Sequence, residues 1–248
     1  ATLGHIFNYN GKEYMVTPDN WERLGFRHGA RKQYDISLTG GSDKMQYYLS
    51  LGYLDNEGIA YNSDFNRITV RAKADYEALK WLRVGTNVNF SRTKYHSITS
   101  DDNGLFYQIN NMAPIYPAFI RDGAGNIMTD ENGPMYDYGD GSLIGYARPI
   151  LPNNNPLQEN KLNTSSSKNN MYSFFGYADI MPIDGLKITL NGTLTSYDSR
   201  GTDATQPFYG YSRTAYPTGF VSRSSDQTYS YNFQQLVNYH HDFGHHHM

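Results

Sequence analysis

Residues 34–90, YDISLTGGSDKMQYYLSLGYLDNEGIAYNSDFNRITVRAKADYEALKWLRVGTNVNF, decide the fold of this chain. Apolar and polar side chains alternate there in four successive runs, the pattern of β-strands that have one apolar face and one polar face. The third run places Ile68, Val70, Ala72, Ala74 and Tyr76 on one side and Arg67, Thr69, Arg71, Lys73 and Asp75 on the other. The contrast between the two sides predicts four antiparallel strands with only one face in an apolar environment.

The amino-acid composition excludes several kinds of protein and of binding site. The formal net charge of −3 argues against a general nucleic-acid binder, which needs a strongly basic face. The chain has no cysteine, which excludes a disulfide framework and thiolate metal sites. No run of about 18 apolar residues is present, so we expect no transmembrane helix. The mean hydropathy of −0.67 is still compatible with a membrane β-barrel, whose inner face and loops are polar.

The rest of the chain is organised around further strands and long connections. We expect a loop over residues 1–31, four strands over 32–93, a long loop over 94–167, two strands over 168–196, a second long loop over 197–227, and a strand and turn over 228–248. Within the loops, Ile6 to Tyr9 has the pattern of a short strand, Pro18 to Asn20 that of a capped helical turn, and Leu105 to Met112 helical spacing.

The lengths of the connections indicate the architecture. Short turns alternate with long loops, so one end of the sheet carries only tight turns and the other end carries every large loop. This is typical of an up-and-down outer-membrane barrel, which has short periplasmic turns and long extracellular loops. A soluble β-sandwich is the alternative. Because a closed barrel needs an even number of strands and has no free edge, seven strands predict a fragment of a larger barrel.

A set of short motifs carries a family resemblance. In chain order they are Asp19-Asn20-Trp21, YDISLTGGSDK at 34–44, YYLSLGY at 47–53, WLRVG at 81–85, Asn155-Pro156-Leu157, DGLK at 184–187 and Phe243-Gly244-His245. Their order and spacing, over about residues 19–248, resemble the SusC/RagA-type TonB-dependent transporters of Bacteroidota.

The resemblance implies an all-β fold, namely about seven strands of a large antiparallel transmembrane β-barrel of about 22 strands. It also implies a cell outer membrane location in contact with lipid, and import of glycans, oligosaccharides or peptides. The implied partners are a SusD-like lipoprotein on the extracellular side and the TonB complex, which acts through an N-terminal plug domain that we expect to lie outside these residues. A soluble or surface-exposed β-sandwich that binds glycans, and a small barrel that acts as an adhesin, are the alternatives from other classes.

Aromatic side chains of the long loop are the candidates for contact with substrate or with the lipoprotein. Aromatic faces pack on the apolar faces of sugar rings and contribute strongly to interfaces. The candidates are Tyr107, Tyr116, Phe119, Tyr136, Tyr138 and Tyr146. The alternative is that these rings pack against one another within the loop.

Basic side chains on neighbouring strands form a second group of candidates. Arg67, Arg71, Lys73 and Arg83 share the polar face, which we expect to line the lumen. They could attract an anionic substrate, but we favour pairing with carboxylates of the plug, since buried charges need partners.

Metal, cofactor and catalytic sites are not expected. The histidines at 240, 241, 245, 246 and 247 could bind zinc, but we favour a histidine-rich hairpin, in part introduced for expression. Asp130, Glu131, Asp137 and Asp140 lack the spacing of a calcium loop, so we favour solvated turns. No G-x-S-x-G and no phosphate loop is present, and we expect no enzyme and no cofactor.

Overall fold

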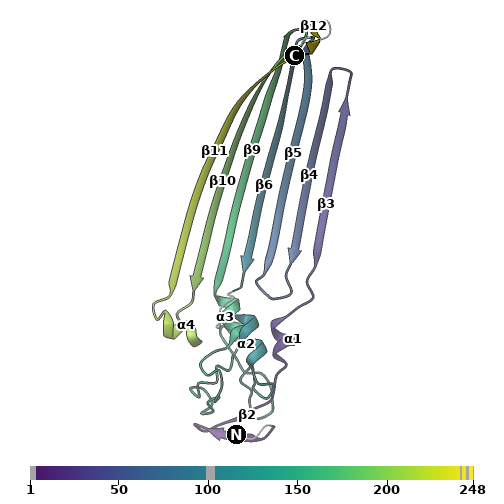
Figure 1. The fold of residues 1–248 in the computed structure, drawn as a ribbon. Coiled ribbons are helices and arrows are strands. Elements are labelled where there is room, and N and C mark those ends of the chain that lie inside the picture. The colour runs from purple at the N-terminus through teal and green to yellow at the C-terminus, as the bar shows by residue number, and fades with distance from the viewer. Residues whose placement is uncertain (1–3, 99–103, 241, 244–245, 248) are drawn as a thin grey trace.

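The computed structural model describes residues 4–98, 104–240, 242–243 and 246–247. One antiparallel sheet of seven strands, in the order β11-β10-β9-β6-β5-β4-β3, dominates the structure (Figure 1). Its strands are β3 (Arg31–Gly41), β4 (Met45–Glu57), β5 (Asp64–Leu79), β6 (Leu82–Ser97), β9 (Thr164–Ile183), β10 (Leu186–Thr205) and β11 (Phe220–Tyr239). Each strand pairs with the sheet strand before it in the chain, which confirms the expected all-β, up-and-down topology.

The other elements are short. The helices are α1 (Trp21–Gly25), α2 (Leu105–Asn111), α3 (Pro156–Leu162) and α4 (Gly210–Ala215). Two-stranded pairs are formed by β1 (Ile6–Tyr9) with β2 (Lys12–Met15), β7 (Thr129–Asp130) with β8 (Gly133–Pro134), and β12 (Asp242–Phe243) with β13 (His246–His247). The strand expected from Ile6 and the helix expected from Leu105 are therefore present, whereas β2 and α3 were not predicted.

The large sheet has one continuous apolar face. Cross-strand register aligns Leu38, Leu49, Ala72, Val88, Phe174, Leu194 and Tyr231 in a single row across all seven strands. Six of these side chains are exposed and Ala72 is partly buried, and Tyr231 is 85% exposed. We call this face, which carries Val88, the apolar face, and the opposite one, which carries Asn89, the polar face. A β-sandwich would cover the apolar face with a second sheet, and none lies on it in the described part of the chain.

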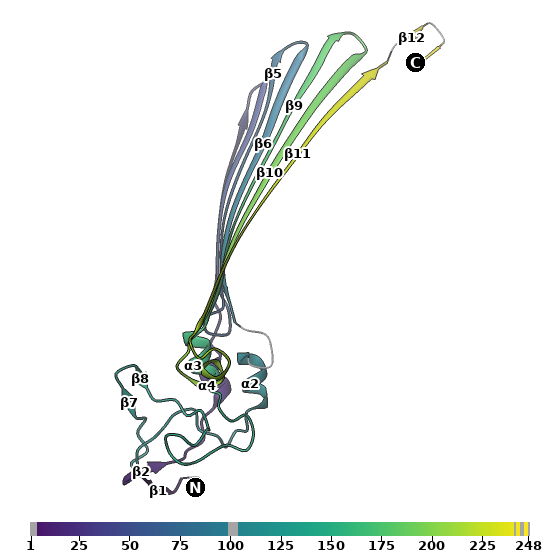
Figure 2. The same cartoon turned by 90° about the vertical axis from the view of Figure 1, so that its left-hand side faces the viewer.

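The two ends of the sheet differ as the connection lengths predicted. One end carries the tight turns at residues 42–44, 80–81 and 184–185. The other end carries the chain before β3 and the connections β4 to β5, β6 to β9 and β10 to β11 (Figure 1). The views in Figures 1 and 2 place the helices and the short strands β1, β2, β7 and β8 together at this second end.

Three strands extend further toward the loop end than the sequence suggested. β9 begins at Thr164, β10 continues to Thr205 and β11 begins at Phe220, so the second long connection is 206–219 rather than 197–227. The extra segments, such as YDSRGTDAT at 197–205, are polar on both faces. Backbone pairing continues there without the apolar alternation that identifies a strand from the sequence.

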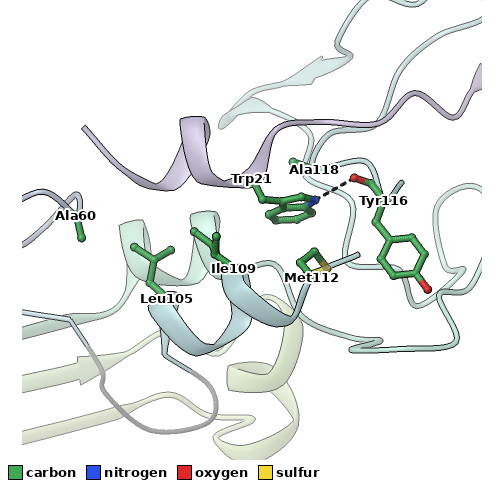
Figure 3. Close-up of a cluster of buried hydrophobic side chains, with 7 residues drawn as sticks. All are labelled: Trp21, Ala60, Leu105, Ile109, Met112, Tyr116 and Ala118. Atoms are coloured by element: carbon green, nitrogen blue, oxygen red, sulfur yellow. Dashed lines mark hydrogen bonds between the residues drawn. The ribbon is translucent and has the colours of Figure 1, made fainter. Parts of the chain in front are cut away.

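The buried core of the structure lies in the loops and not in the sheet. We call residues 4–30, 58–63, 104–163 and 206–219 the loop module. Figure 3 shows its larger hydrophobic cluster, to which α1 and α2 contribute: Trp21, Ala60, Leu105, Ile109, Met112, Tyr116 and Ala118. The Trp21 indole donates a hydrogen bond of 2.9 Å to the Tyr116 carbonyl, which ties α1 to the long loop. A smaller cluster contains Tyr14, Val16, Ile120 and Ile144.

Candidate functional site

A buried arginine organises the loop module. Arg148 donates hydrogen bonds to the carbonyl oxygens of Tyr138, at 2.7 Å, and Asn154. Its guanidinium lies 5.9 Å from the ring centre of Trp21 and 5.7 Å from that of Tyr116, both within cation–π range. Burial lowers the pKa of Arg148, and the neighbouring Asp137 opposes this shift. The guanidinium of Arg148 therefore links parts of the loop module that are distant in sequence, namely the segments around Trp21, Tyr116 and residues 138–154.

Asp137 and Asn155 complete this buried network. Burial raises the pKa of Asp137, while a hydrogen bond from the Gly139 backbone N–H and the charge of Arg148 act in the opposite direction. Asn155 is fully buried, and its side-chain amide donates to the carbonyls of Ala118 and Asp137, each at 2.9 Å. Asn155 is also the N-cap of α3, so the network fixes where that helix begins.

A carboxylate joins the long loop to the second connection. Glu159 on α3 accepts hydrogen bonds from the Tyr211 backbone N–H, at 2.9 Å, and from the Ser212 hydroxyl, at 2.8 Å, both on α4. Burial raises the pKa of Glu159, although these hydrogen bonds lower it in part. Asn163 adds a bond of 3.0 Å from its amide to the Ser212 hydroxyl. Glu159 is therefore the buried charged group among the side chains that attach α4 to the long loop, and it forms two of their hydrogen bonds.

A polar cleft of about 560 Å³ lies where the sheet meets α3 and α4. Ser97, Ser165 and Asp203 contribute from neighbouring strands, and Glu159, Ser212 and Tyr216 from the loop module. The three strand residues are cross-strand neighbours on the polar face. Two carboxyl groups among hydroxyl groups suit a ligand that offers hydrogen-bond donors, such as an amine or a set of hydroxyls.

A second, more apolar cleft of about 350 Å³ opens within the loop module. Phe119 and Tyr136 line it with ring centres 5.1 Å apart, together with Tyr61 from the β4 to β5 connection and Leu157 from α3. Two aromatic rings beside an aliphatic wall suit the apolar face of a ligand or of a partner side chain.

The structure separates the six aromatic candidates. Phe119 and Tyr136 line the apolar cleft, and Tyr107 is exposed on α2. Tyr116 and Tyr138 are buried, and partly buried Tyr146 packs against the smaller hydrophobic cluster. Burial of these last three favours packing within the loop, the alternative kept open above. Ligand contact by Tyr107, Phe119 and Tyr136 stays a prediction.

The four basic candidates lie on the polar face of neighbouring strands, as expected. Lys73 forms an ion pair of 3.1 Å with Asp75 two residues along its own strand. Arg67, Arg71 and Arg83 form no ion pair with any other described residue. Arg83 lies directly opposite Glu77 and Asp179 on the neighbouring strands, whereas Arg67 and Arg71 have no acid directly opposite them.

The candidate metal ligands do not assemble within the described residues, where no group of three or more His, Cys, Asp or Glu side chains gathers. Asp130 and Asp140 accept backbone hydrogen bonds from Asn132 and Ser142, so both carboxylates serve in turns. His241 and His245 lie outside the described residues. Across the described part of the chain, helices that combine the length and hydropathy of a membrane span are absent.

Sequence reasoning missed the polar cleft. Glu159, Asp203 and Ser212 lie in three different connections or strands, and no motif links them. The one local signal was Asn155-Pro156, an N-cap followed by proline in the first turn, which is a typical helix start. This signal predicts that Glu159 lies on a helix, but it does not predict that the helix packs beside α4.

Comparison with known proteins gives consistent relatives, although no family model matches the chain. The chain is 26% identical over 158 residues to TonB-dependent receptor P39 of Formosa agariphila, and 30% identical over 150 residues to TonB-dependent receptor P26 of the same organism. These matches cover 64% and 60% of this chain and 13% of each relative. The chain therefore spans only a small part of the length of its curated relatives.

Solved structures agree on the fold. The RagAB peptide importer in its closed-closed state matches 92% of this chain and 24% of the importer chain, with a TM-score of 0.68 and 23% sequence identity. The open-open state matches 98% of this chain and 25% of the importer chain, with a TM-score of 0.68 and 24% identity. The relatives and neighbours are named as receptors and importers, not as enzymes.

Proposed function

We propose that this chain, whose sequence and fold are those of part of a SusC/RagA-type TonB-dependent receptor barrel, forms a stretch of outer-membrane barrel wall and extracellular loops in a nutrient importer. The observation that carries the proposal is the continuous apolar face, in register across seven strands, with every long connection at one end of the sheet. The chain supplies the wall and the loop module, and the remainder of the barrel and the plug belong to the longer protein.

The height of the apolar face fits a bilayer. On β6 the apolar positions run from Leu82 to Phe90, eight steps of about 3.3 Å or roughly 26 Å along the strand. Outer-membrane barrels carry an apolar band of about 25 Å. Lipid is thus a suitable cover for side chains that the described part of the protein leaves exposed, and the polar face lines the lumen.

Peptides, glycans or oligosaccharides are the proposed cargo, taken up with a SusD-like lipoprotein and energised through TonB. The likeness to the RagAB peptide importer supports peptides most directly. The polar cleft lies on the proposed lumen face at the loop end, where cargo enters. Exposed apolar side chains of the loop module, including Phe208, Ile150 and Ile115, offer contacts for the lipoprotein.

Uptake by the intact organism tests this function. We expect deletion of the gene for the full-length protein to reduce uptake of a fluorescent peptide or oligosaccharide to background, and a plasmid copy to restore it. A protonophore should abolish the same uptake, because TonB draws on the proton gradient. Unchanged uptake of both cargo classes in the deletion strain would overturn the proposal.

A further inference from the structure

Basic side chains lie just beyond the apolar band, on the same face of the sheet. On β6 the alternation continues from Val88 and Phe90 to Arg92 and Lys94 without a change of register. On β9 the same face carries Lys168, two positions beyond Asn170. These cations therefore point outward, away from the lumen and the loop clefts.

Register brings three of the cations together. Lys94 is directly opposite Lys168, and Lys168 is directly opposite Arg200 on β10. Side chains that face each other across an antiparallel pair have Cβ atoms about 5 Å apart, and like charges in such pairs are destabilising. A row of three cations on three adjacent strands favours an anion that bridges them.

The protein itself supplies little counter-charge. Arg200 lies 3.4 Å from Asp198, whereas Arg92, Lys94, Lys168 and Arg223 form no ion pair with other described residues. On β10 and β11, Asp203 and Asp226 lie on the opposite, polar face, whereas Asp198 shares the outward face with Arg200. On the neighbouring strands, Asp55 and Asp64 also face outward, where Asp55 accepts a hydrogen bond from Asn66 and Asp64 pairs with His96. All five basic residues are exposed. On β6, β9, β10 and β11 five cations thus face outward beyond the apolar band, with Asp198 as the one carboxylate on that face of these four strands.

The level of this cluster relative to the membrane is marked independently. Arg92 lies in one cross-strand row with Ile68, Tyr53 and Tyr34. The rings of Tyr34 and Tyr53 stack with centres 6.4 Å apart on the apolar face. Tyrosine is enriched where hydrocarbon gives way to headgroups. The cations on and beyond this row lie at headgroup level on the loop side, which is the outer leaflet.

We propose that Arg92, Lys94, Lys168, Arg200 and Arg223 form a binding site for the phosphate groups of a phosphorylated glycolipid in the outer leaflet. A phosphate monoester carries up to two negative charges and three acceptor oxygens, enough to bridge several cations. The acyl chains of the same lipid cover the apolar face beside the site. This inference rests on the outer-membrane location proposed above.

Native mass spectrometry of the full-length protein in detergent, with added bisphosphorylated lipid A, tests the site. The test variant is Lys94→Gln/Lys168→Gln/Arg200→Gln. The control variant, Arg67→Gln/Arg71→Gln/Arg83→Gln, removes the same charge from the polar face. A basic side chain at an anionic membrane surface is worth about fivefold in binding, so we expect the test variant to bind roughly 100-fold more weakly. The control should stay within about twofold.

The ligand's phosphates are tested separately. We expect dephosphorylated lipid A to bind the wild-type protein as weakly as the phosphorylated lipid binds the test variant. Equal binding of the two lipids, or equal loss in both variants, would overturn the site. Inorganic phosphate that binds as tightly as lipid A would show a free-anion site instead and would also overturn it.

The inference and the proposed function fail in different ways. A wild-type protein found in the outer-membrane fraction and active in uptake, but with no preference for phosphorylated lipid, would remove the inference alone. A protein absent from that fraction would remove both.

Discussion

At the scale of single residues, buried polar groups determine how the loop module is built. Arg148 contacts three chain segments, and Glu159 holds α4 against α3. The sequence could not have identified either residue, because their partners are brought close only by the fold. By contrast, the pattern of residues 18–20 indicated a capped helical turn, and α1 begins there with Asn20 as its N-cap, whose side chain accepts from the Arg23 backbone N–H at 2.8 Å.

Replacing Arg148 should loosen the module locally. Arg148→Met leaves the carbonyls of Tyr138 and Asn154 without their donor and Asp137 without its counter-charge. We expect local stability to fall by about 3 kcal/mol. Hydrogen exchange over residues 136–163 of the full-length protein measures this loss. Arg213→Met is the control, since that side chain is exposed and its ion pair with Asp140 is long, at 4.0 Å. We expect this substitution to change the local stability derived from exchange by less than about 0.5 kcal/mol.

The attachment of α4 should depend on pH through Glu159. Because burial raises the pKa of this carboxyl in the folded protein, the folded state holds a proton that the open state loses more readily. The attachment is therefore strongest below the ordinary glutamate pKa of about 4.3 and weakens as pH rises through the raised value. Hydrogen exchange over 206–219, corrected for intrinsic rates, should show this trend.

Matched variants identify the group responsible for the trend. Glu159→Gln should remove the pH dependence, while Glu22→Gln, at an exposed position, should retain it. A trend that persists in Glu159→Gln would assign the effect to another titrating group.

At the scale of elements, alternation predicts a strand only where its two faces meet different surroundings. The four strands predicted within residues 34–90 are confirmed, because apolar and polar side chains occupy opposite faces there. Residues 197–205 and 222–228 have mostly polar side chains on both faces, and the strands there became visible only through backbone pairing. Glycine predicted a turn correctly where the backbone conformation excludes other residues. Gly185 has φ +80°, and a Cβ there would lie 1.9 Å from the His240 carbonyl oxygen.

A residue with a side chain at Gly185, in the turn between β9 and β10, should therefore destabilise the fold. Gly185→Ala forces an alanine into the left-handed region, at about 1–2 kcal/mol, and into the His240 carbonyl. We expect a clearly smaller fraction of folded barrel, scored by heat-modifiable mobility on gels. Gly192→Ala is the control, because nothing lies within 4 Å of a Cβ there. Equal folding of the two variants would show that this turn is not constrained.

At the scale of the whole molecule, the proposed function requires that the apolar face of the sheet meets lipid and that the polar face does not. Val88 and Asn89 are neighbours in sequence and lie on opposite faces of β6, the central strand of the seven-stranded sheet. Val88 lies between the middle and the loop-side edge of the apolar band, so Val88→Arg should cost about 1–3 kcal/mol and reduce outer-membrane insertion of the full-length protein. Asn89→Arg adds the same side chain to the polar face and should insert normally.

The most direct test of the central claim is lipid contact measured residue by residue on β6. A fluorescent label on a single cysteine at position 88 or 89 of the full-length protein, in bilayers that contain a lipid-borne quencher, reports which side faces hydrocarbon. We predict strong quenching at position 88, little at position 89, and the same alternation at 90 and 91. Equal quenching at both positions, or stronger quenching at 89, would contradict the assignment of the apolar face to the membrane.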